Sequence, residues 1–320
     1  MTTKTPLPIG CGRYDRLRAI EDGRVALDRY DLQINVMPLG QIPPAAFDRR
    51  ELALAEVSTG GFLARLDRGD AGYVGIPAFV SLGFRHDCIY VRSDSRITKP
   101  QDLAGALIGV PEYFGTTGIW LRGMLQDDAG IDPKSVSWWV GPIEGAGGPI
   151  KPNHPPGVTC AYAKPGESMT DLLLRGELDA IFAHRLPQPF RDGRFRRLYS
   201  DLEATERAYY EASGCVPLLH MFVLRDDCRN ADPALPGQVL DAFTRAKDIA
   251  LQDLNETAVY ATSLPSLTQA VERSRSLLGE DFWPYGMARN SKALATFARY
   301  CHEQGLTRRQ FELDEMFPDF

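Results

Sequence analysis

Two segments of the sequence share an order of elements that strongly limits the fold. Residues 55–57 are typical of a short strand that ends in Ser58, Thr59 and two glycines before a helical pattern begins. Residues 108–110 are likewise followed by a turn and by a helical pattern from Thr116. Strands that alternate with helices predict an α/β protein. The free backbone N–H groups at each helix start would suit a carboxylate or a phosphate.

Length and charge narrow the classes of function. A chain of 320 residues is long enough for one large domain or for two of about 150 residues. Its formal net charge is −6, and no run of lysine and arginine is present. This charge argues against nucleic-acid binding, which requires a basic surface. A small anionic ligand is compatible with it, because a few arginines can dominate one cleft.

The N-terminus and the cysteines predict a cytoplasmic protein. The opening segment lacks the apolar core of about 7–15 residues that a secretion signal needs, and no stretch reaches the ~18 apolar residues of a membrane span. The cysteines show no CxxC spacing, so neither a zinc site nor a disulfide framework is indicated. We expect reduced, mostly buried thiols at Cys11, Cys88, Cys160, Cys215, Cys228 and Cys301.

Two further segments resemble each other. HDCIYVRSD begins at His86 and HMFVLRDD begins at His220, and each consists of a histidine, an apolar strand and an Arg/Asp ending. A polar side chain that leads directly into a core strand is unusual. Both histidines are therefore candidates for a site at a strand end.

Other segments resemble the second lobe of type 2 periplasmic-binding-protein folds. They are ITKPQDLAGALIGVPE and DLLLRGELDAIFA. The resemblance implies two α/β lobes, each a mixed sheet flanked by helices, joined by two crossing strands at the segments from His86 and His220. Lobe 1 is then residues 1–93 and 225–320, lobe 2 is residues 94–224, and a ligand cleft lies between them.

More specifically, the chain resembles the 4,5-dihydroxyphthalate decarboxylases over nearly its whole length. The segments that carry the resemblance are GRYDRLRAIEDGRV, FRHDCIYVRSD, GVPEYFGTTGIWLRGML, PLLHMFVLRDD and LLGEDFWPYGMARNSKALATFARYCHEQGL. The resemblance implies non-oxidative loss of CO2 from 4,5-dihydroxyphthalate to give 3,4-dihydroxybenzoate (protocatechuate), as in phthalate catabolism.

Such a reaction needs particular groups. A bare aryl anion is too high in energy, so a proton must reach the ring carbon that loses its carboxylate. The hydroxyl para to that carbon donates electrons as it loses its own proton. The site therefore needs an acid, a base and cationic groups for the carboxylates.

Histidine suits the acid and base roles because its pKa lies near neutrality. His154 and His302 are expected on the surface, whereas the other three histidines stand at strand ends. Glu112 and Tyr113 are able to orient a histidine or to take a phenolic proton. The candidate catalytic residues are His86, His184, His220, Glu112 and Tyr113, and the sequence leaves open which histidine is acid and which is base.

Arginine is the expected partner of the substrate carboxylates, because its planar fork donates two parallel hydrogen bonds. Hydroxyl side chains at the two helix starts serve either as helix caps or as ligand contacts. The candidate substrate-binding residues are Arg16, Arg85, Arg185, Ser58, Thr59, Thr116 and Thr117.

We expect a reaction without a cofactor, since the para hydroxyl supplies the electron sink. A divalent metal that chelates the catechol oxygens is the alternative, although no HxH or HxxxH spacing predicts metal ligands. The expected partner is a small aromatic dicarboxylate, with no nucleic acid and no membrane, and a homo-oligomer is left open. The competing functions are a solute-binding protein for an aromatic or dicarboxylic acid and a related decarboxylase with a different substrate.

Overall fold

The computed structural model describes residues 3–145, 147 and 150–320, and the chain divides into two compact units. Unit 1 comprises Met1–Leu82, Leu218–Ala295 and Phe311–Phe320, and unit 2 comprises Gly83–Pro217 and Thr296–Gln310. The lobe boundaries predicted from the sequence lie after residue 93 and before residue 225, whereas the units divide after Leu82 and before Leu218. This division places the segment from His86 wholly in unit 2 and gives unit 2 a second segment near the C-terminus.

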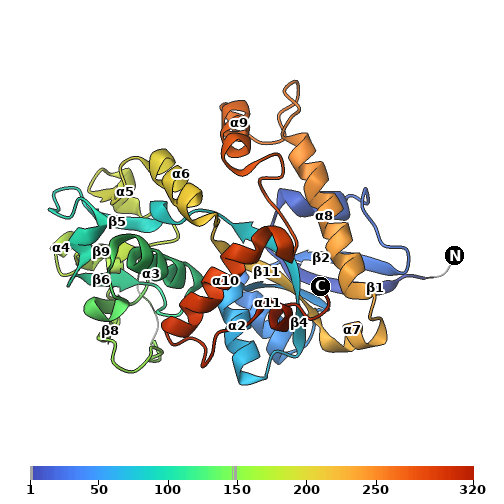
Figure 1. The fold of residues 1–320 in the computed structure, drawn as a ribbon, viewed down its shortest axis with the longest axis horizontal. Helices are drawn as coiled ribbons and strands as arrows, with labels where there is room; N and C mark the ends of the chain where they lie inside the picture. The colour runs from blue at the N-terminus through green and yellow to red at the C-terminus, as the bar shows by residue number, and fades with distance from the viewer. Residues whose placement is uncertain (1–2, 146, 148–149) are drawn as a thin grey trace. The chain divides into compact units, whose positions relative to one another are not determined.

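In its described part, unit 1 has a five-stranded sheet in the order β2-β1-β3-β11-β4 (Figure 1). β1 is parallel to β2 and β3, whereas β11 is antiparallel to β3 and β4. Apolar side chains fill these strands, and Ile9, Leu54 and Phe222 are fully buried. The strands are β1 (Thr5–Cys11), β2 (Tyr30–Val36), β3 (Leu54–Ser58), β4 (Tyr73–Leu82) and β11 (Leu218–Arg225).

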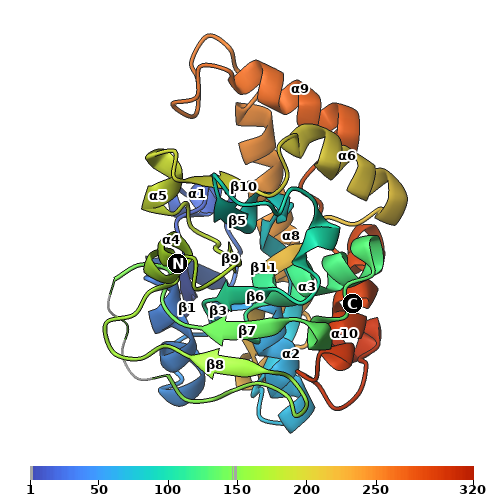
Figure 2. The same ribbon diagram turned by 90° about the vertical axis from the view of Figure 1, so that its left-hand side faces the viewer.

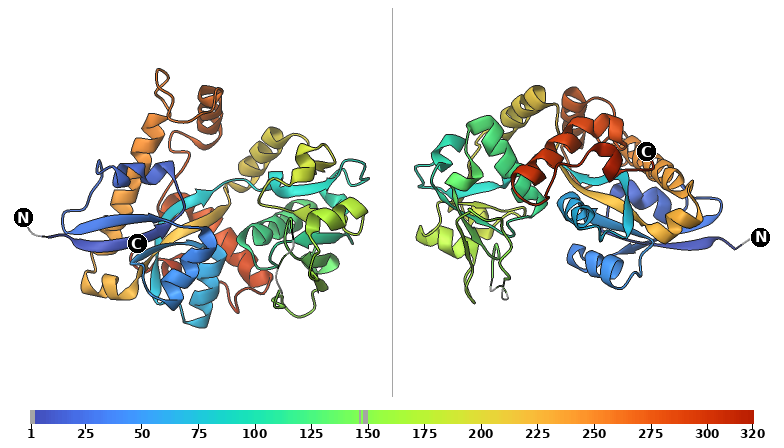
Figure 3. Two further views of the ribbon diagram at one scale, coloured as in Figure 1. Left: turned by 180° about the vertical axis from the view of Figure 1, so that it is seen from behind. Right: turned by 60° about the horizontal axis from the view of Figure 1, so that its bottom comes forward.

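Helices cover both faces of this sheet. α2 and α8 lie on opposite faces (Figures 1 and 3), and Phe222 of β11 packs on Phe243 of α8 with ring centroids 4.6 Å apart. The helices and helical turns are η1 (Asp15–Leu17), α1 (Arg18–Glu21), η2 (Leu39–Gln41), η3 (Pro44–Asp48), α2 (Thr59–Arg68), α7 (Asp226–Ala231), α8 (Leu235–Asp253), α9 (Leu267–Leu278) and α11 (Leu313–Met316). The division between the units falls within α10 (Met287–Glu303).

Unit 2 has a six-stranded sheet, again counted over the described residues, in the order β10-β5-β9-β6-β7-β8. β9, β6, β7 and β8 run parallel to one another, and β5 runs antiparallel to both β9 and β10. Figure 2 shows β6, β7 and β8 side by side. The strands are β5 (Ile89–Arg92), β6 (Leu107–Val110), β7 (Ser137–Val140), β8 (Cys160–Tyr162), β9 (Ala180–Phe182) and β10 (Phe195–Arg197).

Neighbouring residues of β7 face opposite sides of this sheet, as the alternation of a strand requires. Trp138 packs in one core cluster with Leu121 and Leu125 of α3, and Trp139 packs in another with Leu172 of α4. α3 and α4 therefore cover different faces. The helices and helical turns are η4 (His86–Cys88), η5 (Pro100–Leu103), α3 (Thr116–Ala129), η6 (Pro133–Ser135), α4 (Met169–Arg175), α5 (Gln188–Arg191) and α6 (Leu202–Ser213).

The α/β class with two mixed sheets flanked by helices, predicted from the sequence, is confirmed. Within the described residues, no helix has both the length and the apolar character needed to cross a membrane.

Candidate functional site

A buried carboxylate lies at the centre of a polar cluster in unit 1. The side chain of Glu56 has no exposed surface, and its two oxygens accept three hydrogen bonds. Oε1 lies 2.5 Å from Nδ1 of His220 and accepts from the hydroxyl of Tyr14 at 2.6 Å. Oε2 accepts from the backbone N–H of Gly12 at 2.7 Å. A buried charge is tolerable only when it is hydrogen-bonded in this way.

The sheet brings these residues together from three separate segments. β1 and β3 are parallel, so the residue after β1, Gly12, meets the end of β3. β11 is antiparallel to β3, with His220 opposite Ser58 and Phe222 opposite Glu56. Paired residues and those two positions away share one face of a sheet. His220 and Glu56 are therefore diagonal neighbours on the face that packs against α8.

The hydrogen bonds set the charge state of Glu56 and the orientation of His220. Burial alone would raise the pKa of the Glu56 carboxyl, but the bonds from His220, Gly12 and Tyr14 outweigh burial and hold that pKa below its usual range. An ionised Glu56 accepts hydrogen bonds only, so Nδ1 of His220 is the donor. The His220 side chain is 23% exposed, and Nε2 is the ring nitrogen left for a ligand.

Tyr14 joins this pair to a stacked arginine. Burial, followed by the negative charge of Glu56, raises the pKa of the Tyr14 phenol above its usual range. The guanidinium of Arg16 lies 4.9 Å from the Tyr14 ring centre and 4.0 Å from that of Trp283. Arg16 donates to the Asp15 carboxylate at 2.8 Å and to the carbonyl of Val80 at 2.7 Å. These contacts fix the position of the guanidinium.

The predicted hydroxyl residues of unit 1 lie at the start of α2. Ser58 caps the helix, since its Oγ accepts from the backbone N–H of Gly61 at 3.2 Å. Thr59 is 1% exposed, and its Oγ1 has no hydrogen-bond partner among the described residues. The cap function of Ser58 is confirmed, whereas ligand contact by either residue stays a prediction.

His86 in unit 2 has very different surroundings. It opens the turn η4 rather than a strand, and only 2% of its surface is exposed. Its ring packs against those of Tyr199 and Tyr209, at centroid distances of 5.2 and 5.1 Å, and lies 6.4 Å from that of Phe84. Nδ1 is buried without a partner in the part of the chain that is described. Burial lowers the pKa of His86 to about 4, so the imidazole is neutral near pH 7.

The other predicted residues of unit 2 gather at one edge of its sheet, where β6 and β9 end side by side. His184 and Arg185 are exposed after β9. Arg85 is half-buried and donates to the carbonyl of Gly83 at 3.2 Å. The residues that follow β6 complete this edge: Glu112 is exposed, Tyr113 is buried, Thr116 is buried and Thr117 is half-buried.

Details at this edge bear on the expectations for the threonines and for Tyr113. Gly115, not a threonine, is the N-cap of α3, and it makes no side-chain cap bond. The Tyr113 ring faces His154 at a centroid distance of 6.4 Å and carries the guanidinium of Arg122 over its face at 4.1 Å. The expectation that His86 and His220 face one ligand involves both units and stays a prediction.

Sequence reasoning missed Glu56 and Tyr14 as members of the site. A signal for Glu56 was present, because a lone carboxylate interrupts the apolar run of β3 (LAEVS). Its partner His220 is 164 positions away in the sequence. Across the described residues, no group of three or more His, Cys, Asp or Glu side chains is placed to hold a metal ion.

Two curated proteins are similar to this chain in sequence. A 4,5-dihydroxyphthalate decarboxylase of Comamonas testosteroni is 32% identical over 319 residues, which cover 98% of this chain and 97% of that protein. A 4,5-dihydroxyphthalate decarboxylase of Pseudomonas putida is 33% identical over 213 residues, which cover 65% of this chain and 83% of that protein. No family model matches the chain.

Solved structures that resemble the chain confirm the expected fold class. A putative periplasmic sulfonate-binding protein of Methylobacillus flagellatus superimposes with a TM-score of 0.57 at 12% identity, covering 98% of this chain and 91% of that one. The periplasmic aliphatic sulphonate binding protein of Escherichia coli gives a TM-score of 0.54 at 13% identity, with coverages of 98% and 92%. At such low identity the likeness shows the fold alone.

Proposed function

We propose that this chain, which belongs to the family of 4,5-dihydroxyphthalate decarboxylases, removes one carboxylate from 4,5-dihydroxyphthalate to give 3,4-dihydroxybenzoate and CO2. The match to the relative from Comamonas testosteroni over nearly the full length of both chains supports this substrate. The observation that carries the proposal is the bond between His220 and the buried carboxylate of Glu56. This pair supplies an oriented proton donor, which decarboxylation of an aromatic ring requires.

In the proposed reaction, His220 delivers a proton from Nε2 to the ring carbon that bears the departing carboxylate. The phenol para to that carbon loses its proton, and the ring becomes a quinoid dienone. The C–C bond then breaks, CO2 leaves, and the electron pair restores the aromatic ring. The phenolate regains a proton, so the net change is replacement of CO2 by H at one ring carbon. Glu56 acts through His220, because it accepts the hydrogen bond from Nδ1–H and so fixes the direction in which Nε2 points.

Arg16 is the proposed partner of the carboxylate that the product retains. A guanidinium carries five N–H groups, and the bonds to Asp15 and Val80 use only two of them. Stacking on Tyr14 and Trp283 holds the charge in place, so little side-chain entropy is lost on binding. Arg16→Lys keeps the charge and removes the fork. We expect it to raise KM, whereas Arg13→Lys at an exposed position serves as the matched control.

We also propose that the reaction needs no metal. The para hydroxyl supplies the electron sink that a Lewis acid would otherwise provide. Turnover should survive prolonged treatment with a chelator. A loss of rate that returns when a divalent cation is added would instead favour the alternative, in which a metal binds the catechol oxygens.

The compartment that we propose is the cytoplasm. All six cysteines are free thiols in this structure, and unpaired cysteines are the usual state in a reducing compartment. Fractionation of cells that carry the tagged protein would test this, and recovery in a periplasmic extract would contradict it.

The decisive experiment follows CO2 and 3,4-dihydroxybenzoate after the protein is mixed with 4,5-dihydroxyphthalate in D2O. One deuterium should enter the product at the ring carbon that carried the carboxylate. Binding without turnover would overturn the proposal and favour a solute-binding function, to which the fold is also suited. Glu56→Gln should lower kcat by about tenfold or more, whereas Glu51→Gln at an exposed position should not change it.

A further inference from the structure

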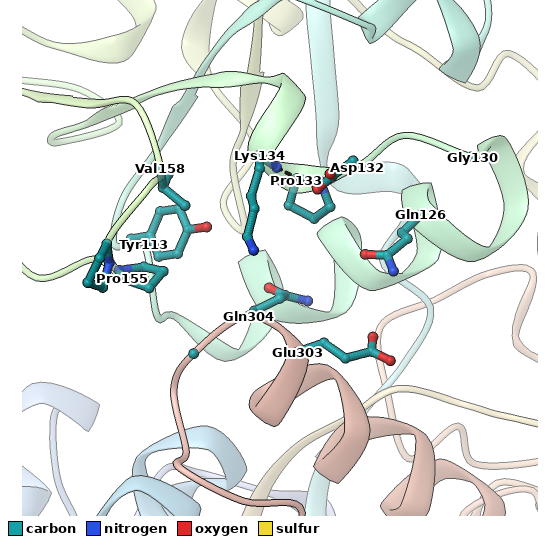
Figure 4. Close-up of a pocket in the computed structure, with 12 residues that line it drawn as sticks. Tyr113, Gln126, Gly130, Asp132, Pro133, Lys134, Pro155, Val158, Glu303 and Gln304 are labelled. Carbon is teal, nitrogen blue, oxygen red and sulfur yellow. Dashed lines mark hydrogen bonds between the residues drawn. The ribbon is translucent and has the colours of Figure 1, made fainter.

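Two lysines lie beside polar groups that the proposed reaction does not use. Lys134 lines a cavity of about 450 Å³ beside η6 in unit 2, but it is exposed, and Asp132 and Glu303 line the same cavity (Figure 4). The described lining thus mixes both signs of charge and selects no class of ligand. Lys247 on α8 in unit 1 is only 1% exposed, and charged side chains are almost never fully buried unless they are paired. The position of Lys247 is therefore explained by its partners.

The ammonium of Lys247 pairs with one carboxylate of its own helix and with one from a distant segment. Nζ lies 2.8 Å from Oδ1 of Asp248 and donates to Oδ1 of Asp281 at 2.7 Å. It also lies 5.8 Å from the ring centre of Tyr285, within the range of a cation–π contact. Asp281 and Tyr285 stand two positions before and two positions after Trp283. Lys247 therefore contacts the chain on both sides of Trp283.

The segment of residues 281–286 is attached to β4 beside the arginine of the proposed site. The indole Nε1 of Trp283 donates to the carbonyl of Phe79 at 2.9 Å. Arg16 donates to the carbonyl of Val80, the next residue of β4, at 2.7 Å. Two neighbouring carbonyls of one strand thus place the guanidinium over the indole, 4.0 Å from the ring centre.

α8 contacts both parts of this stack. It packs against η1, the turn that carries Arg16, and through Lys247 it holds the segment that carries Trp283. An arginine that stacks on an aromatic ring keeps its guanidinium in a fixed plane. The two attachments of α8 therefore set the plane in which Arg16 presents its N–H groups.

We propose that Lys247 is a positioning residue for the carboxylate of the ligand, because it holds the segment of residues 281–286 and so keeps Trp283 against Arg16. This inference rests on the proposed function, in which Arg16 binds the carboxylate that the product retains. Lys247 acts through Trp283 and Arg16 and not by contact with the ligand. When the charge of Lys247 is removed, Trp283 is released, and Arg16 must be immobilised as the ligand binds, which lowers the affinity.

Titration calorimetry of the full chain with 3,4-dihydroxybenzoate and with catechol tests the inference. The two compounds share their hydroxyls, and only the first has a carboxylate. Lys247→Met should weaken the binding of 3,4-dihydroxybenzoate by about fivefold, the scale of immobilising one long side chain, and leave the affinity for catechol unchanged. Lys292→Met, at an exposed position, is the matched control and should change neither affinity. An unchanged affinity of Lys247→Met for 3,4-dihydroxybenzoate, or an equal loss for both compounds, would overturn the inference.

A double variant separates positioning from stability. In Lys247→Met/Asp281→Leu both members of the ion pair are apolar, so neither is left as a lone charge. Chemical denaturation should find this protein at least as stable as Lys247→Met, while the loss of affinity for 3,4-dihydroxybenzoate remains. Affinity that returns together with stability would show that Lys247 only stabilises the fold, and the inference would be wrong.

Trp283→Leu removes the indole and tests the same route without a change at the lysine. It should weaken the binding of 3,4-dihydroxybenzoate by about fivefold or more and leave the affinity for catechol unchanged. An unchanged affinity for 3,4-dihydroxybenzoate would refute the route from Lys247 to Arg16.

Failure of the proposed function gives a different result. The wild type would then bind the two compounds equally, because Arg16 would hold no carboxylate, and the basis of the inference would be lost with it. A wild type that prefers 3,4-dihydroxybenzoate, with the same preference in Lys247→Met, would refute the role of Lys247 alone. None of these measurements needs turnover.

Discussion

His220 and His86 stand at the head of similar sequence segments, yet their environments are opposite. His220 lies on β11 with a buried carboxylate on Nδ1 and part of its ring exposed. His86 lies in a helical turn, enclosed by aromatic rings, with Nδ1 unsatisfied among the described residues. A carboxylate on Nδ1 fixes the orientation of the His220 ring, whereas burial keeps the His86 ring neutral near pH 7. The same residue type thus has a polar, partly exposed environment in one unit and an aromatic, buried one in the other.

The largest expected effect tests whether His220 donates the proton in the proposed reaction. His220→Ala should lower kcat for 4,5-dihydroxyphthalate by about 10²-fold or more, the usual scale for a lost acid or base. His302→Ala, at an exposed position, is the control and should retain the wild-type rate. A His220→Ala protein that is folded and turns over normally would show that the proton comes from another group.

The next largest effect tests whether the His86 side chain stabilises the fold by packing. His86→Ala leaves a cavity among Phe84, Tyr199 and Tyr209, and we expect the free energy of unfolding to fall by about 2 kcal/mol or more. His86→Phe fills the space without the unpaired nitrogen and should restore most of that loss. Chemical denaturation of both variants measures these changes. If His86→Phe is stable but has lost turnover, the catalytic assignment made from the sequence holds for His86 as well.

The pH dependence of stability gives a smaller effect. The pKa of His86 is about 4 in the folded state against an ordinary value of 6.5, so below pH 6.5 only the unfolded chain takes up this proton. The neutral His86 ring therefore contributes in full to the free energy of unfolding above pH 6.5, and this contribution is lost as the pH falls toward 4. Between pH 7.5 and 5.5 the loss is about 1 kcal/mol. His86→Phe should remove this decline, as measured by unfolding across that range.

Glu206 provides a control of opposite sign. Burial raises the pKa of its carboxyl to about 7, so between pH 4.5 and 7 the folded state holds the extra proton. This group stabilises the fold at lower pH and loses that effect as the pH rises. In the wild type the two contributions oppose each other. Glu206→Gln should therefore make the free energy of unfolding fall more steeply as the pH is lowered. An unchanged slope would contradict the raised pKa of the Glu206 carboxyl in the folded state.

The smallest effect concerns how tightly the Glu56 cluster is built. A Cβ at Gly12 would lie 3.2 Å from the Tyr14 ring and 3.4 Å from Oε2 of Glu56, so Gly12→Ala forces a small shift. We expect kcat to fall by only a few-fold. Gly40→Ala, where the added atom meets nothing within 4 Å, is the matched control. A large loss for Gly12→Ala would show that the position of Glu56 is more critical than the hydrogen bonds alone imply.

Much of the fold could be predicted from local sequence. The strand before Ser58 is β3, and the helical patterns predicted after Ser58 and from Thr116 are α2 and α3. Periodicity and capping act over a few residues, so they can be read from the sequence without knowledge of distant contacts. By contrast, the segment that begins with two prolines forms only a π-helical turn, Pro44–Asp48.

By itself, the sequence determined the α/β alternation, the family and the short set of histidines able to move a proton. Only the tertiary structure decided that His220 meets a charged Glu56 while His86 meets aromatic rings. The physical reason is that protonation depends on burial and on partners brought in from distant segments. Local patterns specify strands and helices, whereas the electrostatic environment of a side chain is set by the residues that the completed sheet places beside it.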